Sequence, residues 1–304
     1  QYYDNEIEHY RKVLKFCRLN NVTPIVTMHH FSSPKWLISE GGWESEKTVG
    51  YFKNYCQYVV SKLGDMMCYV CTINEANMGL QIASISKSIM RRMGVMPQIG
   101  INFDQIIEKF LPPEHHQQRK EAAAAFGLAN PSDVHDFLSV RTTEGDMLTM
   151  RAHVAAREAM KKVCPHLQIG LTLSLHDLQP QKGGNEIAKK EWESDFSHYL
   201  PFIKDDDFIG VQSYSRKRID ENGDMGNEDG LTQMNYEFYP KAIGNVIRKV
   251  AAELPGKTIL VTENGIATSD DTRRVEFIKE ATEGVQACIA DGIPVKGYFY
   301  WSLL

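Results

Sequence analysis

Residues 69–79 read YVCTINEANMG, and residues 258–267 read TILVTENGIA. In both stretches, a run of apolar and β-branched residues with the composition of a buried strand ends on an asparagine next to a glutamate. The two glutamates are Glu75 and Glu263. Charged side chains are rarely buried at the end of a strand unless they are paired or used. The pattern predicts two equivalent strands, each presenting a carboxyl group at its C-terminal end.

Strand-like and helix-like runs alternate along almost the whole chain. Strands are expected at 23–29, 68–74, 168–175, 208–214, 258–263 and 295–304. Helices are expected at 4–20, 48–63, 141–163, 187–200, 235–253 and 271–291, with a long excursion of loops and short helices at 77–140. Strands that alternate with helices of this length indicate parallel pairing through right-handed crossovers.

The C-terminal ends of the expected strands carry polar and aromatic residues, which is where a (β/α)8 barrel builds its active site. No glycine-rich nucleotide fingerprint follows any strand, so we favour this TIM-barrel class of α/β fold over a doubly wound sheet. Such a barrel has eight strands, and we count six. The sequence also begins inside an expected helix and ends inside an expected strand. We therefore expect residues 1–304 to be a single but incomplete barrel domain, with about six of its eight βα units.

Composition excludes several classes of function. The 304 residues carry a net charge of −5, so no basic field attracts nucleic acid or an anionic membrane. The longest apolar runs have the length of strands, and we expect no membrane span. The six cysteines lie scattered through expected helices and strands, which predicts reduced thiols and a cytoplasmic protein. Residue 1 is Gln, which leaves an upstream targeting segment open.

Two carboxyl groups that face each other across a small pocket are the groups that cleavage of a glycosidic bond requires. One donates a proton to the leaving oxygen, and the other attacks the sugar or stabilises its developing positive charge. Different surroundings must separate their two pKa values. We expect Glu75 and Glu263 to project into one cavity and to do this chemistry.

Several motifs give the chain its resemblance to glycoside hydrolase family 1, the retaining β-glycosidases. They occur in the family's order along the whole chain: PIVTMHHFSSPKWL (24–37) followed by GGW (41–43), TINEAN (72–77), ILVTENGIA (259–267) and KGYFYWSLL (296–304). The resemblance implies that Glu75 is the general acid/base and Glu263 the nucleophile. It also implies that Asn74 binds the sugar 2-hydroxyl and that His30 binds the 3-hydroxyl. No cofactor and no metal is implied.

Further residues are carried over in the same way. Tyr214 is expected to donate a hydrogen bond to the nucleophile, Trp301 to form an apolar floor under the sugar, and Gln212 to replace the family's sugar-binding asparagine. The chain departs from the family pattern at Ala76, where the family has proline, and at Ser213, where it has tyrosine. Without the resemblance, His30, Gln212, Tyr214 and Trp301 could equally be packing residues at strand ends.

Three hypotheses for function remain open from the sequence. The first is hydrolysis of terminal β-glucosides or β-galactosides, with a small glycoside or oligosaccharide as the partner molecule. The second is a catalytically impaired fragment or pseudoenzyme, because the family's second-strand arginine and its early glutamine and late glutamate lie outside this chain. The third is a barrel isomerase or metal-dependent hydrolase. An open set of strands also exposes two edges, so we expect a homo-oligomer or edges covered by further segments.

Overall fold

A computed structural model describes residues 2–84, 113–226 and 230–302. Contacts divide the chain into two compact units. The first contains residues 1–68 and 72–167, and the second contains residues 69–71 and 168–304.

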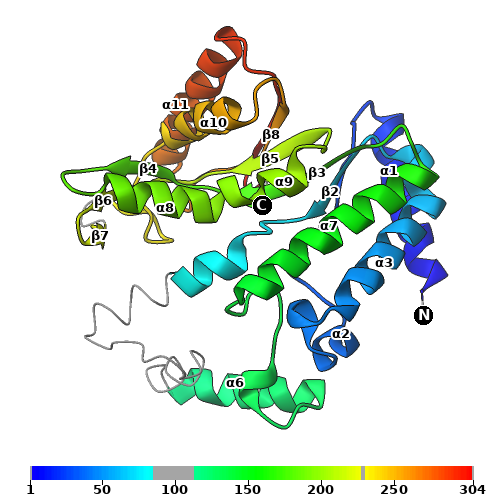
Figure 1. The fold of residues 1–304 in the computed structure, drawn as a ribbon. Coiled ribbons are helices and arrows are strands. Elements are labelled where there is room, and N and C mark those ends of the chain that lie inside the picture. Colours follow the sequence, from blue (N-terminus) through cyan, green and yellow to red (C-terminus); the bar gives the residue numbers. More distant parts are fainter. Residues whose placement is uncertain (1, 85–112, 227–229, 303–304) are drawn as a thin grey trace. The chain divides into compact units, whose positions relative to one another are not determined.

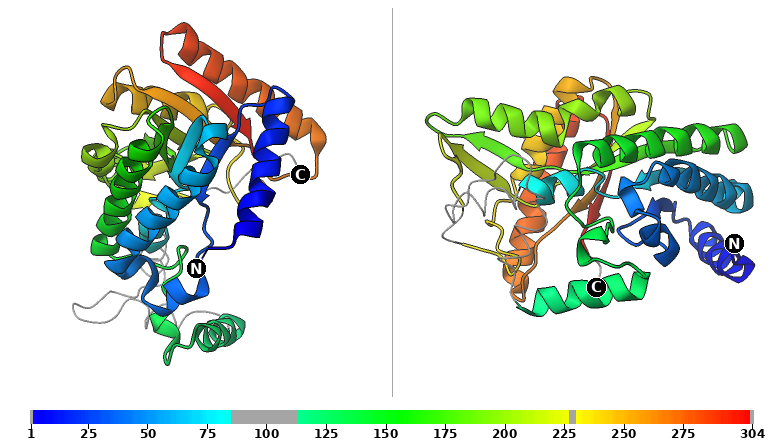
Figure 2. Two further views of the ribbon diagram at one scale, coloured as in Figure 1. Left: turned by 90° about the vertical axis from the view of Figure 1, so that its right-hand side faces the viewer. Right: turned by 60° about the horizontal axis from the view of Figure 1, so that its bottom comes forward.

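The larger sheet contains the six strands that the sequence predicts (Figure 1). They are β1 (Ile25–His29), β2 (Tyr69–Ile73), β3 (Gln168–Ser174), β5 (Phe208–Gln212), β8 (Thr258–Asn264) and β9 (Val295–Tyr300), in the order β1-β2-β3-β5-β8-β9. The ladders that join β2 to β3, β3 to β5, β5 to β8 and β8 to β9 are parallel, as the alternation of strands and helices predicts. Strand β9, the red arrow in Figure 2, follows β8 in this order.

The first unit surrounds β1 and the end of β2 with helices. These are α1 (Asp4–Leu19), α2 (Lys35–Ser39), α3 (Lys47–Leu63), α6 (Pro113–Phe126) and α7 (Thr143–Val163), with 3-10 turns at Gly42–Glu44, Gly64–Met66 and Pro131–Asp133. Helices α3 and α7 lie side by side (Figure 1). Of the predicted excursion at 77–140, residues 85–112 lie outside the described residues. Its described helical parts are residues 78–84, α6 and the turn at Pro131–Asp133.

Helix α7 begins at a residue that the sequence marks. The hydroxyl of Thr142 accepts a hydrogen bond from the Gly145 amide at 3.0 Å, which caps the helix. The Thr142 amide and hydroxyl in turn donate to the carboxylate of Glu44 at 2.8 and 2.6 Å. An anionic side chain at a helix N-terminus is favoured by the helix dipole. About three turns further along α7, Thr72 of β2 is hydrogen-bonded to His153 at 2.8 Å, which fixes the strand to the helix.

Helix α1 differs from its expected packing. An apolar set on a helix is typical of a face packed on the core, but only Leu14 is buried. Val13, Phe16 and Leu19 are 44%, 68% and 73% exposed. Helix α1 packs on α3 through a narrow strip, so most of its apolar surface faces outward.

The second unit is built on β3, β5, β8 and β9. Its helices are α8 (Asn185–Asp195), α9 (Leu200–Ile203), α10 (Ala242–Glu253) and α11 (Asp271–Ala290), with a 3-10 turn at Ser197–Tyr199. The helix predicted at 235–253 begins at Ala242, because Asn235 has a left-handed φ of 60° and Pro240 disfavours helical geometry in the residue before it. Helices α10 and α11 pack side by side (Figure 1).

A second, three-stranded sheet was not predicted. Strands β4 (Asp177–Pro180), β6 (Arg216–Asp220) and β7 (Gly223–Asp224) form it in the order β4-β6-β7. The sequence of β6, RKRID, is too polar to be recognised as a strand, and its partner β4 lies 39 residues earlier, with Asp177 paired to Arg216. Pairing between segments so distant in sequence is a tertiary event.

None of the helices in the part of the chain that the structure describes is long and apolar enough to cross a membrane.

Candidate active site

The first group of predicted site residues lies in the first unit, where β1 and β2 end. The Asn74 amide donates to the His29 carbonyl at 2.8 Å, so the ends of the two strands are tied together. As a result, the Asn74 side-chain nitrogen lies 3.3 Å from Nε2 of His30, within hydrogen-bonding distance. Asn74 and Glu75 are buried, at 3% and 7% exposed, whereas His30 is exposed. The structure therefore brings together the two residues expected to bind sugar hydroxyls.

Glu75 holds an unusual backbone conformation, with φ of 44°. A non-glycine residue in the left-handed region costs about 1–3 kcal/mol and persists only where its surroundings impose it. Here the next residue, Ala76, is fully buried and its carbonyl accepts a hydrogen bond at 3.0 Å from the buried guanidinium of Arg141. Arg141 also donates to the Phe137 carbonyl at 2.8 Å and lies 4.4 Å from that ring.

Arg141 was not predicted as part of the site. It fixes the backbone at Ala76, the position where the sequence departs from the family's proline. A lone arginine before a helix cap carries no signal of its own in the sequence. Only the folded chain shows that it reaches 65 residues back to Ala76.

His29 lies behind this group and is neutral. Its ring packs against Trp43 and Phe137, with centroids 4.8 and 4.7 Å away, and Nε2 lies 3.0 Å from the hydroxyl of Ser33. Burial lowers the pKa of His29 to about 3, and electrostatic interactions with Arg141 and with the His30 ring add to this effect. His29 therefore packs within an aromatic cluster, in contrast to the exposed His30 that follows it.

The second group lies in the second unit, at the ends of β5 and β8. The Tyr214 hydroxyl donates a hydrogen bond to Oε2 of Glu263 at 2.5 Å. Glu263 is buried, at 8% exposed, and Tyr214 is half-buried. The contact implied by the family resemblance is therefore present, and the catalytic roles of the two residues remain predictions. A hydrogen bond donated to a carboxylate favours its charged form.

A break in the ladder between β5 and β8 sets the direction of Glu263. Val211 pairs with Val261, but Gln212 pairs with Glu263, so Thr262 is an extra residue in β8. Such bulges redirect side chains and occur often beside active sites. The shift places the predicted sugar-binding residue Gln212, which is fully buried, directly opposite the predicted nucleophile.

Asn264 links three segments of the second unit. Its side-chain nitrogen donates to the Ser213 carbonyl at 2.5 Å, and its side-chain oxygen accepts from the Tyr298 hydroxyl at 2.7 Å. Its carbonyl accepts from the Trp301 amide at 2.9 Å, and the Trp301 side chain is 51% exposed. Burial raises the pKa of Tyr298 to about 12, with a smaller contribution from Tyr300. Tyr298 keeps its proton and remains a donor to Asn264.

Each unit therefore organises its own share of the predicted site. The first unit carries His30, Asn74 and Glu75, and the second carries Gln212, Tyr214, Glu263 and Trp301. Tyr298 was not predicted as part of the site, because its segment is recognisable from sequence only as a strand. The alternation of Tyr298 and Tyr300 along that strand is the signal that could have shown an inward hydroxyl.

Comparison with known proteins identifies the family. The sequence model of glycosyl hydrolase family 1 matches residues 3–88 and 195–304, and these segments include both Glu75 and Glu263. A 6-phospho-β-galactosidase of Staphylococcus epidermidis is 24% identical over 98% of this chain and 71% of its own length. A β-galactosidase of Pyrococcus woesei is 26% identical over 98% of this chain and 64% of its own length.

Solved structures support the same assignment. The crystal structure of the β-glycosidase BGL167 is 35% identical, with a TM-score of 0.82, over 99% of this chain and 68% of its own. The apo structure of β-glucosidase 1317 is 33% identical, with a TM-score of 0.81, over 99% of this chain and 69% of its own. The predicted (β/α)8 fold class is confirmed, with six parallel strands in this chain. The chain belongs to glycosyl hydrolase family 1 and is a glycoside hydrolase.

Proposed function

We propose that the chain hydrolyses terminal β-glycosides of the β-glucoside and β-galactoside class with retention of configuration. The observation that carries the proposal is the 2.5 Å hydrogen bond from Tyr214 to Glu263, at the end of a strand inside the segment matched to the family. The names of the relatives, β-galactosidase, β-glucosidase A and 6-phospho-β-galactosidase, support the substrate class.

In the first step, the ionised carboxylate of Glu263 attacks the anomeric carbon while the carboxylic acid of Glu75 gives its proton to the glycosidic oxygen. The bond to the aglycone breaks, and a covalent glycosyl-enzyme forms. In the second step, the Glu75 carboxylate takes a proton from water. The resulting oxygen nucleophile attacks the anomeric carbon, and Glu263 leaves as a carboxylate. The mechanism requires the two carboxyl groups to come within about 5–5.5 Å of each other.

Sugar binding is assigned to the residues at the strand ends. His30 and Asn74 offer adjacent polar groups for neighbouring hydroxyls of the sugar ring. Gln212 offers an amide beside the nucleophile, and the exposed indole of Trp301 offers an apolar face for the C–H groups of the ring. This combination of amide, imidazole and aromatic groups suits a polyhydroxylated ligand.

The proposal is tested with aryl β-glucosides and β-galactosides and with azide rescue of two variants. In Glu263→Ala, azide replaces the nucleophile, attacks once and gives the α-glycosyl azide. In Glu75→Ala, azide replaces water after the covalent step and gives the β-glycosyl azide. Removing the general acid lowers the rate by about 10²–10⁴-fold for poor leaving groups. Exposed Glu186, on α8, provides the control variant Glu186→Ala, which should keep wild-type activity.

A 2-deoxy-2-fluoroglycoside should trap the covalent intermediate on the peptide that contains Glu263, as peptide mass spectrometry would show. An adduct on another carboxylate, or azide products of the opposite configuration, would contradict the assignment. A folded wild-type chain that hydrolyses none of these substrates would instead indicate a catalytically impaired member of the family.

A further inference from the structure

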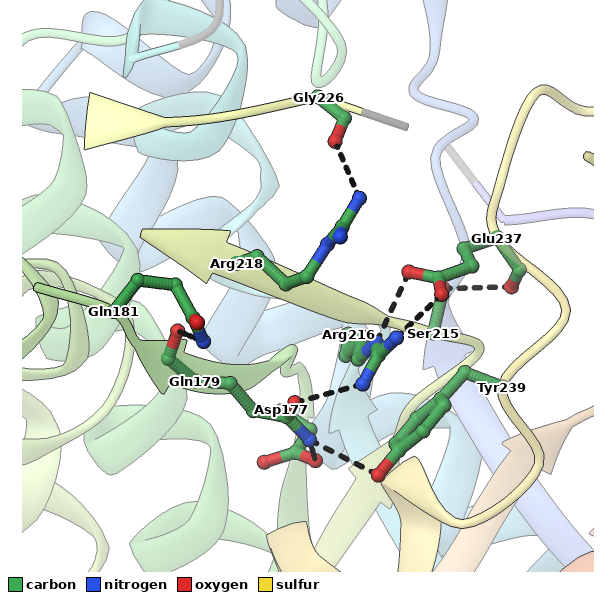
Figure 3. A network of polar contacts seen from close by, with 9 residues as sticks. All are labelled: Asp177, Gln179, Gln181, Ser215, Arg216, Arg218, Gly226, Glu237 and Tyr239. Carbon is green, nitrogen blue, oxygen red and sulfur yellow. Dashed lines mark hydrogen bonds and ion pairs between the residues drawn. The ribbon is translucent and has the colours of Figure 1, made fainter. Parts of the chain in front are cut away.

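An ion pair in the second unit joins the segment after β5 to the segment before α10 (Figure 3). Arg216 donates from Nε and Nη2 to the two carboxylate oxygens of Glu237 at 3.0 and 2.6 Å. The guanidinium also lies 4.1 Å from the centre of the Tyr239 ring. The two charged side chains are only 22% and 17% exposed. The pair is bidentate, stacks on an aromatic ring and is largely shielded from solvent. It therefore fixes the relative position of its two segments better than an ordinary surface ion pair would.

Regular secondary structure anchors this pair. Nη1 of Arg216 donates to Gln179 of β4 at 3.0 Å, and Gln179 donates to Asp177 at 2.7 Å and to the Tyr239 hydroxyl at 3.1 Å (Figure 3). Asn245 of α10 also donates to Asp177, at 2.8 Å. The network therefore connects β4, β6 and the start of α10.

Two further contacts connect Tyr214 and its neighbour Ser215 to residues 236–237. The Ser215 hydroxyl donates to the Glu237 carbonyl at 2.8 Å. The ring of Tyr236 lies 6.3 Å from the ring of Tyr214, at an angle of 35° between the planes. Consequently, residues 236–237 hold residues 214–216 through a ring contact, a side-chain-to-backbone hydrogen bond and an ion pair.

We propose that Arg216 and Glu237 are positioning residues for Tyr214, whose hydroxyl they keep on the carboxylate of Glu263. The inference rests on the proposed function, in which Glu263 is the nucleophile. It adds a role for two residues that touch neither the sugar nor the reacting atoms. Catalysis is sensitive to displacements of about 1 Å that begin far from the chemistry.

Weakening the pair has two expected consequences. The Tyr214 hydroxyl donates less effectively, so the charged form of the nucleophile loses stabilisation and the acidic limb of the kcat/KM profile moves to higher pH. The loss falls mainly on kcat, because the residues that bind the sugar are unchanged. The hydrogen bond from Arg216 also lowers the pKa of Glu237, which favours the charged form of this carboxylate.

The test compares Glu237→Gln with a matched control, Glu191→Gln, which removes the carboxylate partner of Lys217, the next residue of β6. Glu237→Gln keeps the size of the side chain and removes its charge. We expect kcat/KM to fall about tenfold and the acidic limb to move up by about half a pH unit. In the control Glu191→Gln, the Lys217–Glu191 pair is lost, whose atoms are 2.7 Å apart and whose side chains are each 19% exposed. The control should leave both quantities unchanged.

A double-mutant comparison decides whether the effect passes through Tyr214. In a Tyr214→Phe background, Glu237→Gln should lower kcat no further, because residues that act as one unit are not additive. Fully additive losses would overturn the proposal. Arg216→Lys keeps the positive charge but cannot donate two parallel hydrogen bonds to the carboxylate. Its kcat/KM should therefore lie between the values of wild type and Glu237→Gln.

A second measurement is independent of activity. In protein labelled with 3-fluorotyrosine, the ¹⁹F resonance of Tyr214 is identified by its loss in Tyr214→Phe. This resonance should move in Glu237→Gln and stay in place in Glu191→Gln. An unchanged resonance in Glu237→Gln would overturn the positioning role. If the resonance moves in Glu237→Gln while the wild-type protein has no glycosidase activity, the positioning role is supported and only the proposed function is rejected.

Discussion

Single residues hold the two candidate catalytic carboxylates in different ways. Glu75 is constrained through its backbone, because its φ of 44° is held next to a carbonyl that the buried Arg141 binds. Glu263 is constrained through its side chain, by the hydroxyl of Tyr214. The proposed mechanism requires one carboxyl group to carry a proton and the other a charge. Unequal surroundings of this kind allow two carboxyl groups to take different protonation states.

A pH prediction follows from His29. Its folded-state pKa is lowered from 6.5 to about 3, so below about pH 6.5 the unfolded chain takes up a proton that the folded chain refuses. Stability therefore falls as the pH drops from about 6.5 towards about 3. At pH 5 this residue costs about 2 kcal/mol, which is 1.5 pH units at about 1.4 kcal/mol each.

Urea unfolding at pH 7 and pH 5 measures this cost. In His29→Gln, the loss of unfolding free energy between the two pH values should be smaller than in wild type by about 2 kcal/mol. The control His9→Gln, at an exposed position of α1, should lose as much as wild type. An identical loss in His29→Gln and wild type would contradict the assignment.

At the scale of elements, close backbone contacts set how α10 and α11 pack. A Cβ atom added at Gly244 of α10 would lie 3.3 Å from both the Cα and the carbonyl oxygen of Gly284 in α11. A Cβ atom added at Gly284 would lie 3.7 Å from the Cα of Gly244, which is an ordinary contact. The two glycines face each other, yet only one is sterically required.

This asymmetry predicts opposite outcomes for the same substitution. Gly284→Ala should raise the free energy of unfolding by about 0.5–1 kcal/mol, because alanine is the better helix former and its methyl group fits. Gly244→Ala should lower it, since the backbone of α11 would have to move away. Thermal and urea unfolding of the two variants measure both changes. Equal stabilisation by both would show that the helices can separate without cost.

At the scale of the whole molecule, the described part of the chain has two strands at the ends of its sheet order and several exposed apolar side chains. Strands β1 and β9 stand at the two ends of the strand order. Phe16 and Leu19 on α1 are 68% and 73% exposed, and Phe299 on β9 is 43% exposed. Unpaired strand edges attract other strands, and contiguous apolar surface marks contact with another chain.

We therefore expect the 304-residue chain to self-associate. Size-exclusion chromatography with light scattering should give a mass above the 34.6 kDa of one chain. The double variant Phe16→Glu/Leu19→Glu should shift this mass downward, because charges cannot be buried cheaply in the contact. The exposed pair Lys182→Glu/Glu186→Lys, on the other unit, serves as a control for altered charge. A compact monomer of the wild-type chain would contradict the prediction.

The sequence by itself determined the six parallel strands, the helices between them and the carboxyl groups at the strand ends. Residues 69–79 and 258–267 carry this information locally, because runs of β-branched residues specify strands and the parallel order places their C-terminal ends at one edge. Motifs in the family's order along the chain then made the family recognisable.

Only the tertiary structure decided which residues hold the candidate site residues in position. Arg141 reaches Ala76 across 65 residues, and Arg216 reaches Glu237 across 21 residues through a small sheet of polar strands. The extra residue in β8 that sets Gln212 opposite Glu263 appears only when β5 and β8 pair. Each of these contacts joins segments whose local sequences are compatible with many partners. Their choice of partner is made by burial and hydrogen bonding in the folded chain, because an unpaired buried charge or amide is too costly to leave in place.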